Sequence, residues 1–486
     1  MVTEKFRRQL RQEAEKWWQE GWIDASLYQR LSERYQLDEI ETSANNRFVT
    51  ILLSLGGVLL GLGVITFVAA NWQEWSREFR VFLLMGLFVG VNAAGFYLWR
   101  RPASSRGLQR LGHGLLLAGA LILGANMALM SQMFHQSGVV YELYFIWGLG
   151  VTAMAYSLRL VSLGVLAWIL LFISYWVWWF SGSFTQGATW IGMMINEMAL
   201  VASLVFIPLA YWCRSRIIFC LGGIIFAVCF VFGIRPLSLW NNPNAGWLVA
   251  IAFTLPAALL WAYNLDAWRF SRSSGSRVAS PVPVAADPFQ AIARSLAICF
   301  FGILFYIFAF HWFWNDSLYR SASDRWNWQS WHYLDVILFI ALTVLGWLRL
   351  SYQLRSLRIF QERSVNTGAI AVFIILTAVI FSWHTSIQPL PIIAPFLLNL
   401  MLFLLAIALI RDGLALGTRR TFWGGMSLLV LSIISRILEY DTDLLLKAFV
   451  FVLCGVSVIA AGLYFERNLK PSRTALPTNS SPESMP

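Results

Sequence analysis

Long apolar runs separated by short polar segments dominate this chain. Most runs approach or exceed the ~20 residues that an α-helix needs to cross a bilayer. The pattern predicts an all-α, polytopic membrane protein with about fourteen transmembrane helices, within a range of twelve to fourteen. The predicted spans are 48–70, 81–99, 111–133, 139–158, 160–180, 193–213, 217–233, 247–264, 295–314, 333–348, 367–386, 391–410, 422–440 and 448–465.

The polar segments divide the chain into five parts. Residues 1–47 are expected to form a small cytoplasmic helical hairpin, followed by a membrane bundle of about eight helices over 48–264. Residues 265–294 are rich in Ser, Pro and Arg, which is typical of a flexible linker and places it in the cytoplasm. A second bundle of about six helices covers 295–465, and residues 466–486 are expected to be a disordered cytoplasmic tail.

The hairpin is predicted from amphipathic spacing and from its turn residues. Between residues 3 and 20, apolar side chains recur on one helix face, among them Trp17 and Trp18. Gly21 suits the left-handed position just after a helix, and Asp24 suits the cap of the next one. A hairpin this small buries little by itself. We therefore expect residues 3–36 to bind a protein partner or a second copy, with docking on the chain's own membrane domain as the alternative.

Composition agrees with a lipid environment. Of the 486 residues, 58% are hydrophobic and 13% are charged, whereas soluble proteins carry about 25% charged residues. The lipid bilayer is therefore the main expected partner.

The net charge of +11 reflects topology rather than a nucleic-acid surface. With the N-terminus inside, the predicted cytoplasmic segments hold 29 of the 36 Lys and Arg residues and the outer loops hold 6. Basic residues are retained on the cytoplasmic side. The alternation predicts a multi-pass protein of the bacterial inner membrane with both termini in the cytoplasm, and no nucleic-acid partner.

Two segments near the N-terminus carry a resemblance to a known family. WWQEGWIDASLYQRLSERYQ and the following LLSLGGVLLGLGVITFVAANWQEWSREFR resemble the start of the bacterial predicted membrane proteins grouped as domain of unknown function 2157. The resemblance covers about the first 130 to 150 residues. It implies a bacterial cytoplasmic-membrane protein and no particular chemistry.

Small and amide side chains suggest where the first helices pack. Membrane helices associate through small residues and hydrogen bonds, so Gly-x-x-x-Gly spacings and intramembrane amides are expected at contacts between helices. The expected packing positions are Gly57, Gly61, Gly86, Gly90, Asn92 and Asn126. Pro208 and Pro256 lie inside predicted spans and are expected to kink them.

Ionisable residues cluster near the predicted outer ends of the spans. Intramembrane charge is the usual indicator of function in a membrane protein. Six residues are candidates for a polar vestibule open to the outside: Glu142, Glu197, His311, Asp335, Arg436 and Glu439. Their distance from the midplane argues against a proton-coupled carrier. The Trp-rich segment 311–335 is typical of an interfacial loop, with a platform for a sugar or lipid headgroup as the alternative.

Signatures of catalysis and of metal binding are missing from the sequence. It has no GxSxG, no GxxxxGK[ST], no HExxH and no CxxC, and its five cysteines suggest neither a disulfide framework nor a zinc site. We expect no cofactor, no metal site and no enzymatic activity. The favoured function is an interaction or membrane-organising protein. The alternative is a transporter or flippase for an amphiphilic or glycan-bearing substrate.

Overall fold

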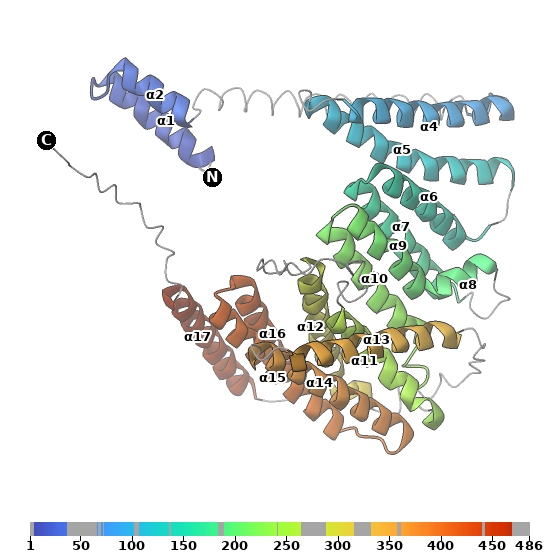
Figure 1. The fold of residues 1–486 in the computed structure, drawn as a ribbon, viewed down its shortest axis with the longest axis vertical. Helices are drawn as coiled ribbons and strands as arrows, with labels where there is room; N and C mark the ends of the chain where they lie inside the picture. Colours follow the sequence, from blue (N-terminus) through green and yellow to red (C-terminus); the bar gives the residue numbers. More distant parts are fainter. Residues whose placement is uncertain are drawn as a thin grey trace. The chain divides into compact units, whose positions relative to one another are not determined.

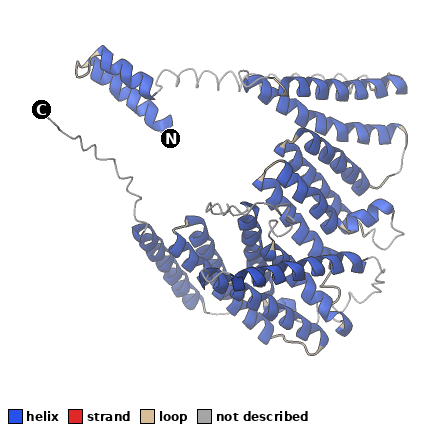
Figure 2. Cartoon of the chain, in the orientation of Figure 1, coloured by secondary structure: helices blue, strands red, loops and turns tan. Residues whose placement is uncertain are grey.

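The computed structural model is helical wherever it describes regular structure, and its described residues contain no strand (Figure 2). The described residues are 4–35, 66, 70, 72–101, 106–135, 138–182, 189–240, 242–263, 288–314, 332–356, 361–439 and 443–468. The predicted all-α fold class is thus confirmed for this part of the chain. Residues 265–287 of the predicted linker, most of the segment 36–71 and residues 469–486 of the predicted tail lie outside it. Residues 288–294, predicted as linker, instead belong to the helix Pro288–Phe308, and residues 466–468, predicted as tail, belong to the helix Leu444–Asn468.

The chain divides into two compact units, Met1–Ala93 and Ala94–Pro486. The helices described in the first unit are α1 (Glu4–Gln19), α2 (Ala25–Tyr35) and most of α4 (Arg77–Trp99). The second unit contains α5 (Arg106–Met133), α6 (Val140–Leu158), α7 (Val161–Phe180), α8 (Trp190–Asn196), α9 (Met198–Trp212), α10 (Arg216–Ile234), α11 (Gly246–Ala262), α12 (Pro288–Phe308), α13 (His332–Ser356), α14 (Gln361–Ser386), α15 (Ile393–Leu416), α16 (Arg419–Glu439) and α17 (Leu444–Asn468).

α1 and α2 contact each other across a short turn. Gly21 has a φ of +76°, the left-handed conformation expected of it. As predicted, Asp24 caps α2, because its carboxylate accepts the Leu27 backbone N–H at 2.8 Å. The rings of Trp18 and Tyr28 stack at a centroid distance of 5.3 Å, which holds one helix against the other.

Ten described helices are long and apolar enough to cross a membrane, or eleven if the bent pair α8 and α9 is one span. Three of the fourteen predicted spans are not among them. Residues 48–70 lie almost entirely outside the described part of the chain. α6 is a 19-residue helix whose tyrosines and Glu142 lower its hydropathy, and the apolar stretch described in α17 is short, Lys447–Leu463.

α11 is the most enclosed of the candidate spans. It packs against α10, α12, α13 and α14 (Figure 1). In the candidate span Pro243–Ala262, which contains α11, 83% of the residues in the most apolar stretch are buried. Alanines along the helix, including Ala252 and Ala257 at 0% exposure, let neighbours approach from several sides. Since α12 to α14 follow the predicted linker, one hydrophobic core extends over both predicted membrane bundles.

Chain segments from the same predicted side of the membrane meet at the ends of the helices. At the predicted cytoplasmic side, the hydroxyls of Tyr211 and Tyr263 lie 3.0 Å apart, and the Trp212 indole N–H donates to the Tyr156 carbonyl at 3.1 Å. At the predicted outer side, the ring of Trp240 lies 5.0 Å from that of His384. This arrangement is the one that a multi-pass bundle requires.

Candidate functional site

The membrane helix that begins at Trp190 is broken at Glu197. α8 and α9 meet there at an angle of 73°, and Glu197 leaves the helical conformation with φ −86° and ψ 30°. The Thr189 hydroxyl caps α8 by accepting the Gly192 N–H. Beside the break, the Asn196 amide donates to the Glu197 carboxylate at 3.0 Å. The break therefore presents a carboxylate at a point where the backbone changes direction.

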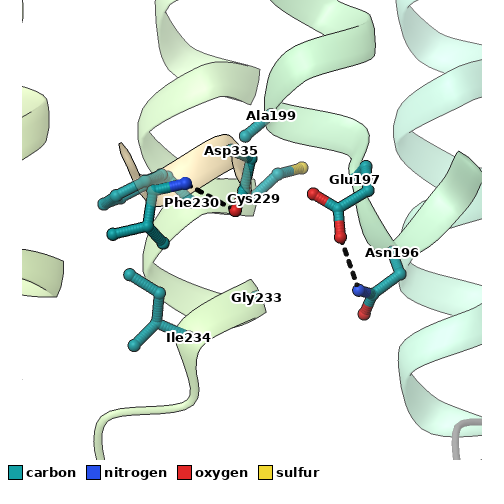
Figure 3. A pocket seen from close by; sticks show the side chains of 9 residues that line it. Asn196, Glu197, Ala199, Cys229, Phe230, Gly233, Ile234 and Asp335 are labelled. Carbon is teal, nitrogen blue, oxygen red and sulfur yellow. Dashed lines mark hydrogen bonds between the residues drawn. The ribbon is translucent and has the colours of Figure 1, made fainter. Parts of the chain in front are cut away.

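A second carboxylate, from Asp335, faces this break. Asp335 lies in the first turn of α13 and accepts the N–H of Val336 at 2.6 Å. It lines one small pocket with Glu197 (Figure 3), so the two carboxyl groups are near enough to influence each other. Cys229, Phe230 and Gly233 of α10 are also in the wall.

The free space in the pocket is about 20 Å³, which is enough for a single water molecule. Two adjacent carboxylates repel when both are ionised, so this arrangement favours a shared proton or a bound cation. Within the described residues, no group of three or more His, Cys, Asp and Glu side chains is arranged to hold a metal ion.

His311, Arg436 and Glu439 form a second group. Arg436 pairs with Glu439 one turn along α16 and donates to the Ala309 carbonyl at 2.6 Å. Glu439 accepts the His311 backbone N–H at 2.8 Å, and its carboxylate lies 3.8 Å from the His311 imidazole. The guanidinium also lies 4.1 Å from the centre of the Phe310 ring. Through these hydrogen bonds and charge contacts, the group connects the C-terminal end of α16 to the segment that follows α12.

Glu142 belongs to a third group. At the start of α6, its carboxylate accepts a hydrogen bond of 2.8 Å from the Thr189 hydroxyl, the same side chain that caps α8. The six predicted residues are thus brought together in three groups, each joining parts of the chain that are distant in sequence. A single vestibule containing all three stays a prediction.

The predicted packing residues have different surroundings. Gly57 and Gly61 lie outside the described residues. Added Cβ atoms at Gly86 and Gly90 would meet no described atom within 4 Å. The Asn92 amide donates at 2.8 Å to the Phe88 carbonyl of its own helix instead of the expected neighbouring helix, because a side chain reaches the carbonyl four residues earlier.

Asn126 is buried at 5% exposure. On the same helix, α5, the carbonyl of Ala120 accepts the Trp147 indole N–H of α6 at 2.8 Å, and a Cβ at Gly124 would collide with the same indole ring. The small residues of α5 therefore admit a tryptophan of α6.

The two intramembrane prolines do not end their helices. α9 continues through Pro208, and α11 continues through the buried Pro256. The sharp bend lies at Glu197, eleven positions before Pro208 in the sequence. The signal that could have located it is the adjacent polar pair Asn196 and Glu197 within an apolar run.

An aromatic cluster around His384 was not singled out from the sequence. The His384 imidazole accepts the Leu390 N–H at 2.9 Å, and the rings of Trp240 and Trp314 lie within 5.0 Å of it. These residues lie in three separate regions of the chain, so no local pattern could have assembled them.

Comparison with known families gives one match. Residues 15–164 match the family model described as a predicted membrane protein, DUF2157. The predicted resemblance of the N-terminal third is thereby confirmed. The DUF2157 match includes α2, α4, α5 and α6, and with them Glu142, while Glu197, Asp335 and Arg436 lie beyond it. No curated protein and no solved structure matches the chain.

Proposed function

We propose that this chain is a non-enzymatic interaction or membrane-organising protein that binds a protein partner or a second copy of itself through α1 and α2. The observation that carries the proposal is the exposure of Trp17, Trp18 and Trp22, which are 37%, 49% and 78% exposed. Tryptophan is enriched among the residues that dominate binding energy. Exposed apolar patches on small modules mark contact surfaces.

The proposed setting is the bacterial inner membrane, with fourteen spans and both termini in the cytoplasm. This count adds residues 48–70, α6 and α17 to the eleven candidates. The Ser174 hydroxyl near the end of α7 donates to the carbonyl of Tyr141 at the start of α6, which supports α6 as an antiparallel span beside α7. The asymmetry of 29 against 6 basic residues supports the sidedness.

Replacing the exposed indoles tests the function. In the full chain, Trp17→Ser combined with Trp22→Ser should abolish self-association, or retention of a co-purifying partner, after cross-linking in intact membranes. Deleting residues 1–40 should have the same effect. The matched control is Tyr352→Ser, which removes a 77% exposed aromatic side chain of α13. Unchanged association in the double variant, with the control also unchanged, would contradict the proposal.

The helix break supports a second candidate function, a transporter or flippase for an amphiphilic or glycan-bearing substrate. Membrane transporters often build substrate sites at discontinuous helices. Here a 73° break places Glu197 opposite Asp335 in a pocket formed with α10. The pocket has room for one group of about the size of a water molecule, so a single hydroxyl of the substrate can enter it and donate a hydrogen bond to a carboxylate.

Substrate-dependent thermal stabilisation separates the two functions. A transporter deleted for residues 1–40 should still be stabilised by a glycolipid added in detergent, and Glu197→Gln or Asp335→Asn should remove that stabilisation. Glu78→Gln, an exposed carboxylate change in the first turn of α4, is the control. A panel of glycolipids that leaves the melting temperature of the intact chain unchanged would reject this second candidate.

A further inference from the structure

The two ends of the α1–α2 hairpin carry opposite charge. α1 and α2 lie side by side (Figure 1) and are joined by a turn at residues 20–24. Residues 4–11, the first half of α1, hold four basic residues and one acidic residue, a net charge of +3. Residues 13–24, the rest of α1 and the turn, hold four acidic residues and one basic residue, a net charge of −3. We call these segments the basic end and the acidic end; α2 adds a net charge of +1.

The exposed indoles belong to the acidic end. Trp17 and Trp22 alternate along the chain with exposed carboxylates, among them Glu13 and Glu20. Glu13 lies 3.7 Å from Lys16, yet these side chains stay 53% and 65% exposed. A bilayer surface does not suit this combination, because the cytoplasmic leaflet is negatively charged and attracts basic segments. The acidic end is therefore complementary to a basic protein surface that also offers apolar contacts.

A second copy of the same hairpin supplies such a surface. Its basic end has a net charge equal and opposite to that of the acidic end, and Phe6 and Leu10 lie among the basic residues in the sequence. The 16 residues of α1 extend over about 24 Å. When two α1 helices lie antiparallel, each acidic end meets the basic end of the other copy. The two contacts are then identical, as a two-fold axis requires.

We infer that two copies of the chain pair through antiparallel α1 helices, acidic end to basic end, with Trp17 and Trp22 in the contact. The inference rests on the proposed function and specifies its partner. Two copies inserted with the same orientation are related by an axis along the membrane normal, so both hairpins lie on one side of the bilayer. Anchoring in one bilayer raises their effective concentration, and a contact as small as one helix pair is then sufficient.

An exchange of charge in the full chain tests this pairing. Glu13→Lys with Glu20→Lys changes the acidic end from −3 to +1, and Arg8→Glu with Arg11→Glu changes the basic end from +3 to −1. In each variant, both ends have the same sign. The yield of cross-linked dimer in membranes should fall roughly tenfold for either variant alone, because like charges then meet. Co-expression of the two variants with different tags should restore a mixed dimer, since their ends are complementary.

Two further measurements control for the location of the charges and identify the partner. Arg411→Glu with Arg420→Glu changes two exposed arginines outside the hairpin by the same amount and should leave dimer formation unchanged. A photoreactive amino acid in place of the exposed Gln19 should give a dimer of the chain after illumination. Hydrogen exchange of residues 25–35 at wild-type rates in both charge variants shows that the hairpin is intact.

Unchanged dimer formation by either charge variant would overturn the inference, as would a mixture that forms no mixed dimer. Photoproducts of position 19 that contain only lipid or only a different protein would also overturn it. The proposed function fails in a different way, because Trp17→Ser combined with Trp22→Ser then leaves association unchanged. Loss of association in the tryptophan variant, with both charge variants still associating, would retain the function of the hairpin and reject the antiparallel second copy.

Discussion

Glu439 receives hydrogen bonds from two different regions of the chain. Arg436 approaches it from the same helix, and the backbone of His311 approaches from the segment after α12. The side chains of Arg436 and Glu439 are only 17% and 15% exposed. A charge in such surroundings depends on its partner, because water is not available to replace it.

Glu439→Gln should therefore lower the free energy of unfolding by roughly 3 kcal/mol, since it leaves the Arg436 guanidinium without its counter-charge. Thermal melting in detergent measures this loss. Replacing both residues by leucine should recover part of it. Glu78→Gln is the control, because Glu78 is exposed and a change there is expected within about 0.5 kcal/mol. Equal melting temperatures for the Glu439 and Glu78 variants would contradict the assigned pairing.

Asp24 gives the helix α2 a dependence on pH. Hydrogen bonds from the Leu27 backbone N–H and the Ser26 hydroxyl lower the pKa of this carboxyl below its ordinary value of 3.8. A carboxyl whose pKa is lowered by folding stabilises the folded state above its unfolded pKa, and the stabilisation is lost as pH falls through the folded pKa. Amide exchange of residues 25–35 should accelerate more steeply below about pH 4 in the wild type than in Asp24→Asn. Parallel pH profiles would show that the cap contributes nothing.

For single residues, the sequence predicts where a side chain lies along a helix, and it does not predict which side chain it contacts. Apolar runs interrupted by Glu197, Asp335 and Glu439 predicted that acids lie near span ends. The pairing of Glu197 with a residue 138 positions later depends on which helices become neighbours. Helical periodicity gives the face of a residue and not the helix that covers it.

At the scale of elements, the α15–α16 hairpin depends on close backbone approach. Gly417, with φ +63°, ends α15, and a Cβ at Gly413 would lie 2.5 Å from the Phe422 backbone nitrogen. The two helices can therefore pack this closely only with glycine at position 413.

Gly413→Ala should destabilise the protein by about 1–3 kcal/mol, the usual cost of overpacking. Gly424→Ala is a matched control, since a Cβ there would meet nothing within 4 Å. The measurement is the melting temperature of each purified variant, which should fall by several degrees only for the change at position 413. A comparable fall for both alanine variants would contradict a specific role of the close contact at position 413, because alanine by itself favours the helix more than glycine does.

Element boundaries were largely predictable because apolar length and polar interruptions determine them. The bend at Glu197 was not, because it lies at a polar residue and not at a proline. Helices α9 and α11 continue through Pro208 and Pro256, and the kinks predicted at these two prolines stay predictions. The six residues expected in one vestibule lie in three groups, each joined by tertiary packing, and a single vestibule containing all three stays a prediction.

For the whole molecule, the decisive property is which chain segments face the same compartment. In a variant lacking the five native cysteines, single cysteines at positions 275 and 418 should react with a membrane-impermeant reagent only after the inner membrane is opened. A cysteine at position 320 should react in intact cells. The expected pattern follows from the retention of basic segments on the cytoplasmic side. Labelling of position 275 from outside would reverse the proposed orientation.

The enclosure of α11 has a consequence for how the protein is made. Helices enter the membrane in chain order, so α11 is inserted before α12, α13 and α14, which later cover it. Until the ribosome has added at least another hundred residues, the alanine-rich surface of α11 faces lipid or the insertion machinery. A messenger truncated within the 264–287 connection should consequently yield a product that quality-control proteases remove, and supplying the missing C-terminal half from a second gene should rescue it.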